Sequence, residues 1–338
     1  MPFWIFKEKE DDKAKREAQE ASVKELERGN LPLGAQHRLK TQAASGSKFF
    51  SSNFSAKEYL LAREAGYEPI GQVMGSAFVQ VGFRAFAFGY GQSTGEIAAL
   101  TVSHRKAREL AVSRLRQEAE ILGAHGVIGV KIKTSTFSWG EGLTEFTAIG
   151  TAIRVPNPEL IAASKNLPFT STLSGQEFWQ LYEAGFWPTG LVMGNCSYYA
   201  KGTQQTASAQ QGFFGSQINQ ELVAFSEGFV TARKQATQRL WNEIGMSLGD
   251  GAVDMNIDYK LQRIEYTSGN RTIIDMLVHF MAMGTAITER SDAKARISKT
   301  PRMVIDLSGS GLSSVDFEDP LYSMGGYSSS FDDDDALD

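Results

Sequence analysis

The sequence predicts an α+β fold built from two tandem domains, each a small sheet packed by one long helix and a short preceding helix. The first observation is a duplication, in which residues 50–75 match residues 169–194 at a constant shift of 119 positions without a gap. The second is a long helical pattern at 96–123 that recurs around 221–251 at a shift of 125. Because short helix, strands, long helix and strands occur twice in that order, an α+β arrangement fits better than alternating βαβ units.

Each copy begins with a sequence typical of a short, capped helix. A serine is followed three residues later by glutamate, which is the capping-box pattern, and a glycine stands at the expected carboxyl end. These residues are Ser55, Glu58 and Gly66 in the first copy and Ser174, Glu177 and Gly185 in the second. The segments IGQVMG and TGLVMG, which come next, are predicted to be strands.

The long helix is predicted from apolar residues at helical spacing, which form a stripe wide enough to pack on a sheet. In the first copy these residues are Ile97, Leu100, His104, Ala107, Ala111 and Leu115. The predicted helix starts at Glu96 in the first copy and at Glu221 in the second. A glycine-rich turn then leads into a strand, and a last strand ends in GTAI in both copies.

These patterns divide the chain into four segments. They are a charged arm and linker at 1–48, the first repeat at 49–155, the second repeat at 168–290, and a tail segment at 291–338. Residues 8–28 could form a solvated helix, but they lack a continuous apolar stripe, so a mobile arm is the favoured interpretation. Residues 31–48 carry Pro, Gly and Ser and are interpreted as a linker.

The last segment combines a candidate edge strand, PRMVIDLSG at 301–309, with an acidic tail. The tail, GGYSSSFDDDDALD at 325–338, is typical of a disordered segment. An acidic docking peptide for a protein partner is the alternative interpretation.

Composition limits the class of protein. A chain of 338 residues with 42% hydrophobic residues can bury two cores. The net charge of -5 predicts no nucleic-acid partner, which would need a basic face. Cys196 is the one cysteine, so no disulfide framework is expected. No apolar run reaches the roughly 18 residues of a membrane span. A cytoplasmic protein is expected, although the aromatic start MPFWIF is compatible with a membrane or partner contact.

A metal site is not predicted. Soft metals prefer thiolate and imidazole ligands at defined spacing, and the four histidines form no pair at i, i+3 or i, i+4. His104 aligns with Phe229, which favours packing over coordination. His125 aligns with Asp250 in a glycine-flanked turn, where both are ordinary turn residues as well as candidate ligands. No cofactor is predicted either.

An enzyme is also not predicted. The pattern G-x-S-x-G occurs as GQSTG at 91–95 and GMSLG at 245–249. A nucleophile elbow needs a strand before the serine and a helix after it, and GMSLG has the reverse order. Ser93 in GQSTG aligns with Ile218, and no Asp-then-His pair follows it within the repeat. The same segment could seat an anion at a helix start, but turn chemistry is favoured. We therefore assign no catalytic residue.

The charged residues retained in both copies are more informative. They are Arg108, Arg114 and Glu118 in the first copy and Arg233, Arg239 and Glu243 in the second. Arg108 and Glu118, like Arg233 and Glu243, lie near the apolar face of the predicted helix, where an unpaired charge is costly. Arg114 and Glu118 are predicted to pair at i, i+4, as are Arg239 and Glu243. Arg108 is expected to pair with a carboxylate on another element, either within its domain or across a subunit contact, and Arg233 likewise.

The ordered motifs resemble the YbjQ family, which is labelled a heavy-metal-binding domain. They are GE-x-x-x-L followed by AR-x-x-A, then EAEILGAHGVIGVKI and finally IGTAI. The first copy resembles the family over 69–154, and the second, over 188–288, has GDG in place of GAHG. The resemblance implies small α+β domains that assemble into pentameric rings and have no established catalytic activity. A duplicated chain would then form a ring with two tiers or with alternating repeats.

We therefore expect a non-enzymatic oligomeric scaffold or interaction protein built from two YbjQ-like domains. The alternative is a metal- or small-ligand-binding protein in which single His or Asp residues converge at subunit contacts.

Overall fold

The computed structural model describes residues 4–45, 51–80, 93–136, 143–156, 168–203, 221–268 and 271–290. The chain divides into two compact units, Met1–Lys294 and Ala295–Asp338, and every element described below lies in the first. The candidate edge strand and the acidic tail fall outside the described residues.

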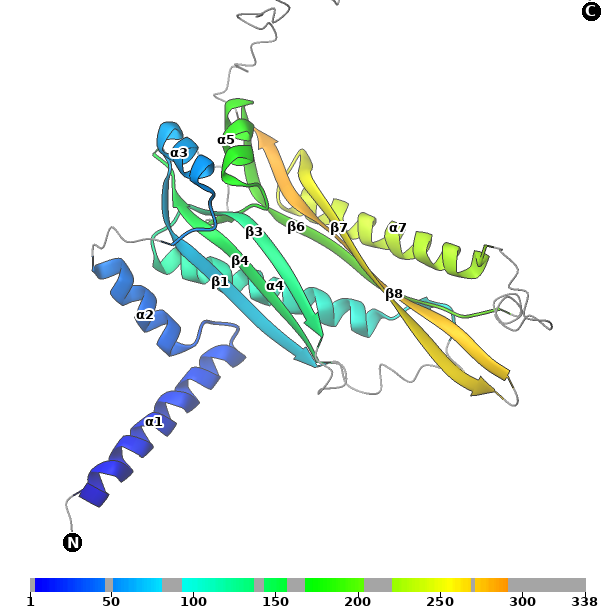
Figure 1. The fold of residues 1–338 in the computed structure, drawn as a ribbon, viewed down its shortest axis with the longest axis horizontal. Helices are drawn as coiled ribbons and strands as arrows, with labels where there is room; N and C mark the ends of the chain where they lie inside the picture. The colour runs from blue at the N-terminus through cyan, green and yellow to red at the C-terminus, as the bar shows by residue number, and fades with distance from the viewer. Residues whose placement is uncertain are drawn as a thin grey trace, which may run out of the picture. The chain divides into compact units, whose positions relative to one another are not determined.

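The expected α+β fold and its repeated order of elements are confirmed (Figure 1). The first copy contains α3 (Ala56–Ala65), β1 (Glu68–Gln80), β2 (Gly95–Glu96), α4 (Ala98–Ile121), β3 (Gly126–Thr136) and β4 (Leu143–Arg154). The second copy contains β5 (Phe169–Thr170), α5 (Gly175–Glu183), β6 (Phe186–Ala200), α7 (Val223–Met246), β7 (Gly251–Ser268) and β8 (Arg271–Glu289). The long helices α4 and α7 each have 24 residues and start 125 positions apart, as the sequence alignment predicts.

The strands form two sheets of four. The first sheet has the order β1-β4-β3-β5 and the second has the order β2-β6-β8-β7. The three long strands of each sheet come from one copy and pair antiparallel, with Gly75 opposite Ala148 in the first sheet and Gly194 opposite Ala282 in the second. The fourth strand of each sheet, however, comes from the other copy. The two copies therefore exchange short strands.

Both short helices begin as their capping boxes predict. The Ser55 hydroxyl accepts a hydrogen bond from the Glu58 amide, and the Ser55 amide donates to the Glu58 carboxylate. Ser174 and Glu177 repeat both bonds. Gly66 ends α3 with φ +78°, a left-handed conformation that glycine adopts without a steric penalty.

The long helix of each copy crosses the first long strand of its own sheet, β1 or β6, at very close range. A Cβ atom on Gly75 would overlap the carbonyl oxygen of Ala111 in α4. On Gly194 it would overlap the carbonyl oxygen of Ala236 in α7. Only a residue without a side chain lets helix and strand backbones approach this closely, so both positions require glycine.

The N-terminal segment differs from the expected linker. Residues 33–44 form a helix, α2 (Leu33–Ala44), and α1 (Trp4–Glu27) precedes it. Leu31 and Leu39 are buried in the core of the first copy, and this apolar contact orders a segment whose composition suggests a loop. The charged arm, for which a mobile arm was favoured, forms α1, and the exposed middle of this helix matches the alternative interpretation of a solvated helix.

The start of the long helix also differs. It was expected at Glu96 but lies at Ala98, because Gly95 and Glu96 pair as β2 with Tyr199 and Tyr198 of the second copy. Local sequence predicts the helix well, but it carries no information about a strand partner about a hundred residues away.

Candidate functional site

The most extensive feature that the sequence did not predict is the contact between the two copies. One apolar cluster joins Tyr67, Ala62, Ile128 and Ile153 of the first copy to Phe169, Leu173, Phe178 and Trp187 of the second. These rings interlock, with Tyr67 and Phe178 edge-to-face at 5.5 Å between ring centroids. Each large apolar side chain buried in this way contributes roughly 1.5–3 kcal/mol. The copies therefore share a core and do not merely touch.

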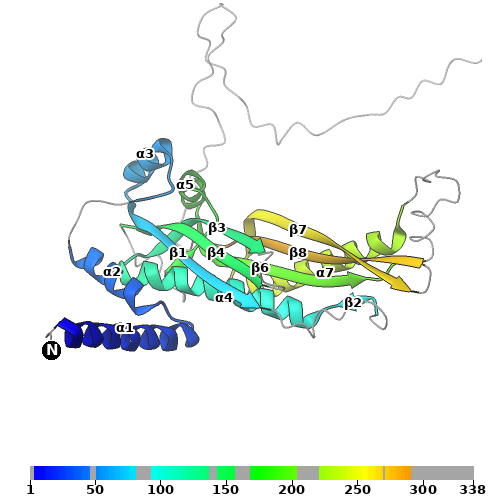
Figure 2. The same ribbon diagram turned by 60° about the horizontal axis from the view of Figure 1, so that its bottom comes forward.

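A second apolar cluster lies at the opposite end of the contact. Ile97 and Leu100, at the start of α4, pack on Tyr199 and Leu277 of the second sheet. In Figures 1 and 2, α3 lies beside α5 at one end of the sheets, whereas β2 lies far from them, near the other end of β6. The contact between the copies therefore extends along much of β6.

Between these clusters, the first half of α4 supplies partners for β6. The Ile97 amide donates to the Ser197 carbonyl oxygen at 2.8 Å, and the Ser197 amide donates to the Thr101 hydroxyl at 2.9 Å. The Asn195 side-chain amide donates to the Thr101 carbonyl oxygen at 2.9 Å. An edge strand exposes backbone donors and acceptors that must find partners when they are buried. Here the other copy provides them.

The two long helices lie on opposite faces of the second sheet. On β6, Gly194 and Cys196 contact α7, whereas Asn195 and Ser197 contact α4. Successive residues of a strand point to opposite faces, so α7 covers one face and the first half of α4 covers the other. We call the face opposite a copy's own long helix its outer face.

An ion pair crosses the contact between the copies. Arg239 donates from Nη2 to Oε2 of Glu96 at 2.7 Å and from Nη1 to the Asn195 carbonyl oxygen at 2.8 Å. The predicted Arg239–Glu243 pair is therefore wrong. Burial alone would lower the pKa of Arg239, but the Glu96 carboxylate raises it above its usual value.

The predicted Arg114–Glu118 pair is wrong as well. Arg114 Nη1 donates to the Ser76 carbonyl oxygen at 2.6 Å, and Glu118 Oε2 accepts from the Met74 amide at 2.9 Å. Glu118 also lies 3.4 Å from Arg38 in α2. The backbone groups at the free edge of β1 are thus hydrogen-bonded by charged side chains of α4. A charge-assisted bond to an unpaired backbone group is stronger than an exposed pair on one helix turn.

The second copy repeats this anchoring of a strand by charged side chains of its long helix, which we call the helix clamp. Glu243 Oε2 accepts from the Met193 amide at 2.7 Å, at the position that corresponds to Met74. Burial raises the pKa of the Glu243 carboxyl group, and the same cause raises that of Glu118. Retention of these residues in both copies is therefore explained by helix-to-strand anchoring.

Arg108 lies inside the contact between the copies. It is 5% exposed, and its guanidinium carbon lies 5.4 Å from the centre of the Phe146 ring. Burial lowers its pKa to about 10, while Asp258 and Glu243 of the second copy act to raise it. None of the described carboxylates lies within 4.0 Å of it, so the expected direct ion pair is not formed there. Its counterpart Arg233 is exposed.

Two histidines meet in the same contact. The rings of His104 and His279 lie 5.2 Å apart, and His279 Nδ1 lies 3.0 Å from the Ser197 hydroxyl. Burial, together with the charge of His279, lowers the pKa of His104 to about 3. Burial and the charges of Lys260 and Arg108 lower that of His279 to about 4. Both imidazoles are therefore neutral at physiological pH.

The described residues contain no group of three or more His, Cys, Asp or Glu side chains placed to hold a metal ion. His125, one of the two turn residues considered as ligands, accepts a hydrogen bond at Nδ1 from the Val155 amide at 3.1 Å. Asp250 accepts bonds from Thr288 and from the Glu289 amide. Burial raises the pKa of the Cys196 thiol to about 11, which keeps it protonated.

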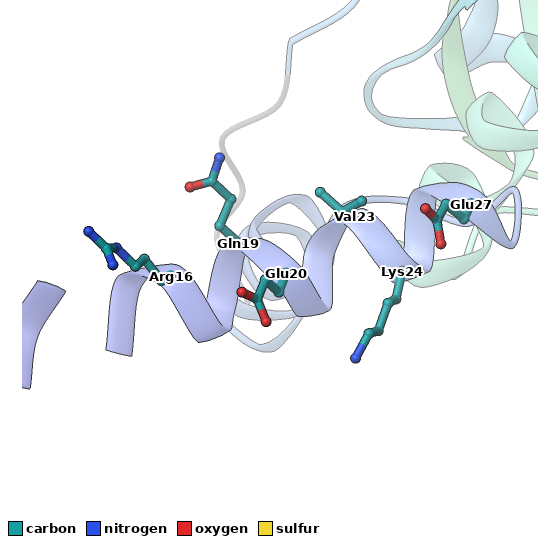
Figure 3. A pocket seen from close by; sticks show the side chains of 6 residues that line it. All are labelled: Arg16, Gln19, Glu20, Val23, Lys24 and Glu27. Atoms are coloured by element: carbon teal, nitrogen blue, oxygen red, sulfur yellow. The ribbon is translucent and has the colours of Figure 1, made fainter. Parts of the chain in front are cut away.

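A shallow hollow on α1 does not form a binding site. It is lined by one helix alone, through Arg16, Gln19, Glu20, Val23, Lys24 and Glu27. Figure 3 shows Gln19 and Val23 on one side of the helix and Lys24 on the other, so the side chains do not converge on a common centre. A ligand site needs polar groups that converge from several directions.

The Glu96–Arg239 ion pair is expected to couple the two copies by about 1 kcal/mol, because both side chains are partly exposed and solvent screens the attraction. A double-mutant cycle with Glu96→Gln and Arg239→Met in urea unfolding measures this coupling. The exposed Arg105–Glu109 pair is the control, and a coupling of about 0.3 kcal/mol is expected there. A Glu96–Arg239 coupling no larger than the control would remove the ion pair from the account of the contact.

Comparisons with known proteins agree with the family suggested by the motifs. The YbjQ_1 family model, described as "Putative heavy-metal-binding", matches residues 69–156. UPF0145 protein TTHA1944 of Thermus thermophilus is 39% identical over 61 residues, which are 18% of this chain and 52% of that protein. UPF0145 protein BH0643 of Halalkalibacterium halodurans is 41% identical over 61 residues, 18% of this chain and 56% of that protein.

A longer match extends into both copies. The encapsulin nanocompartment protein Rv1762c of Mycobacterium tuberculosis is 31% identical over 265 residues, which are 77% of this chain and 92% of that protein. No described helix is long and apolar enough to cross a membrane. At this identity and coverage, the chain belongs to the same family as Rv1762c, and its first copy carries a YbjQ-type domain.

Proposed function

We propose that this protein is a non-enzymatic, cytoplasmic scaffold that works as a homo-oligomer and is a component of a nanocompartment. The compartment is taken from the printed name of Rv1762c, which describes that protein. We also propose that the second copy is a YbjQ-like domain, since it repeats the order, the helix clamp and the glycine crossing of the first.

The observation that carries this proposal is the contact between the copies. The domains join by exchanging strands, by burying aromatic clusters and by placing a helix on a neighbouring sheet. Contacts of this kind resemble obligate subunit interfaces, which are core-like and apolar at their centre. Four of the charged residues retained in both copies anchor a strand of their own copy, and one of them, Arg239, also crosses the contact to Glu96, which supports an assembly role for that residue; the four are Arg114, Glu118, Arg239 and Glu243.

Native mass spectrometry tests the proposal on full-length protein purified without chelator or affinity metal. We expect one assembly of several chains. Its mass should be a whole multiple of the polypeptide mass, with no added mass from a metal ion. A five-chain ring is the stoichiometry that the resemblance implies. A monomer at micromolar concentration would overturn the scaffold proposal.

The second candidate is a metal- or small-ligand-binding protein. The approach of His104 and His279 across the contact favours it, because two imidazoles from different domains converge there. Stoichiometric metal in the native mass, lost in His104→Phe, would establish this candidate in place of a purely structural role for the pair.

A further inference from the structure

One part of the contact between the copies is directional. The first copy contributes the first half of α4, and the second copy contributes the outer face of its sheet. Because the copies are repeats, each also possesses the surface that the other one uses. Among the described residues, the surface of α7 that corresponds to the first half of α4 is not used in this way. The same holds for the part of the first sheet's outer face around Met74 and Phe78, whereas Ile128 and Ile153 elsewhere on that face already pack on the second copy.

The outer face of the first sheet is open where its counterpart is covered. Met74 and Phe78 on β1 are 50% and 59% exposed. At a shift of 119 their counterparts are Met193 and Ser197, which are only 8% and 1% exposed beneath the first copy. Both side chains point to the same face of the sheet, with Ser76 between them, and exposed large apolar side chains on one face are typical of a surface that another molecule covers.

The first half of α7 is open in the same way. Thr101 and Arg108 of α4 are 3% and 5% exposed, whereas their counterparts Ser226 and Arg233 lie at the surface, half-buried and exposed respectively. Phe225, which replaces Leu100, is only partly buried. The helix therefore offers an apolar and polar pattern that matches the one already used inside the chain.

We propose that the first half of α7 in one chain lies on the outer face of the first sheet of a second copy of this chain. The contact between the copies is thereby repeated between chains. This inference rests on the proposed homo-oligomeric function and specifies its interface. Such a heterologous contact uses two different surfaces, so it builds a ring if the rotation closes and a filament otherwise.

The charges across the proposed interface are complementary. Inside the chain, Arg108 lies close enough to His279 to lower the histidine pKa. Strand register makes Glu145 the counterpart of His279, so Arg233 would meet a carboxylate where Arg108 meets an imidazole. Glu118 is the counterpart of Glu243 and adds a second negative charge. Two positive charges oppose these attractions: Lys133, which stands at the place of Asp258, and Arg38, which lies 3.4 Å from Glu118.

The proposed contact requires the hydrogen bond between Arg114 and the end of α1 to break. Arg114 Nη2 donates to the Leu26 carbonyl oxygen at the end of α1, whereas the corresponding Arg239 Nη2 donates to Glu96. The counterpart of Glu96 is the exposed Glu221, two residues before α7. In the assembled protein, Glu221 of one chain would replace the Leu26 carbonyl at Arg114 of the next.

Site-directed cross-linking tests the register of this interface. Thr101 and Ser197 bond directly inside the chain, and Ser226 and Phe78 are their counterparts. Two full-length chains, Ser226→Cys and Phe78→Cys, are co-expressed in a Cys196→Ala background and treated with a short bismaleimide. We expect a shift from the mass of one chain to that of two covalently joined chains in the mixture. Neither chain alone should give this shift.

Two controls accompany the experiment. Gln238→Cys co-expressed with Phe78→Cys should give no shift, because Ser113, the counterpart of Gln238, is exposed and lies outside the contact. Thr101→Cys combined with Ser197→Cys in one chain should cross-link within that chain. Its yield is the reference for the cross-linking yield between chains. A mixture no better than the Gln238 control would overturn the interface.

The native mass separates this failure from failure of the proposed function. If the wild-type protein is an oligomer but the Ser226 and Phe78 variants do not cross-link, another surface assembles it and only this inference falls. If the wild-type protein is a monomer, both fall together. Cross-linking of Ser226→Cys chains with one another would point to a symmetric contact and would also overturn the inference.

Discussion

Gly75→Ala is expected to destabilise the protein by about 3 kcal/mol or more, because the new methyl group has no room. It would overlap the Ala111 carbonyl oxygen and approach the Leu115 amide nitrogen to 2.5 Å. Both atoms belong to the backbone of α4, so no side-chain rotation relieves the overlap. The helix must move off the strand, which would also weaken the Arg114 and Glu118 bonds to β1. Urea unfolding followed by far-UV circular dichroism measures the change.

Gly71→Ala is the matched control, since it lies on the same strand. There the nearest atom to a new Cβ is Gln42 Nε2 at 3.6 Å, an ordinary contact with a flexible side chain. We expect a change within about 1 kcal/mol. Gly194→Ala should reproduce the Gly75 result, because it would meet Ala236 in the same way. Equal stabilities for the Gly75 and Gly71 variants would show that the crossing is looser than described.

The features predicted correctly from the sequence are those that local residues determine. The Ser55 and Ser174 capping boxes form, and both long helices follow their apolar stripes. The duplication supports each prediction, because two different sequences independently predict the same elements in the same order. The α+β fold could therefore be predicted from one chain.

The features that were missed depend on partners distant in sequence. Arg239 lies one turn from Glu243, and the local rule pairs them, yet Glu96 takes the arginine from 143 positions away. The linker prediction failed for the same reason, since Leu39 is ordered by packing on a remote helix. One signal was available for the clamp, namely that both charges recur in each copy beside a glycine-containing strand. Strand exchange leaves no such signal.

Acid is expected to weaken the contact between the copies through His104 and His279. Their pKa values are about 3 and about 4 in the folded protein, compared with about 6.5 in an unfolded chain. Above pH 6.5 both states are neutral at these positions and stability is unaffected. As the pH falls from about 6.5 to 4, the unfolded chain binds protons that the folded protein excludes. Stability is then lost by at most about 1.4 kcal/mol per pH unit for each histidine.

Glu118 and Glu243 act in the opposite direction, because burial raises the pKa of each and their protonation favours the folded state. A variant comparison removes this background. His104→Phe copies Phe229 of the second copy, keeps an aromatic ring against Phe146 and deletes one titrating group. Relative to wild type, it should gain about 2 kcal/mol between pH 8 and pH 4.5, after allowance for partial solvent screening.

His37→Gln serves as the control, because it removes a histidine that is exposed on α2. Urea unfolding at half-unit pH intervals provides both curves. If His104→Phe and wild type keep a constant difference in stability across this range, the imidazole pair does not resist protonation. The contact between the copies would then be open to water at its centre. In that case the interface proposed between chains, which copies this contact, would be wetter and weaker than its apolar residues indicate.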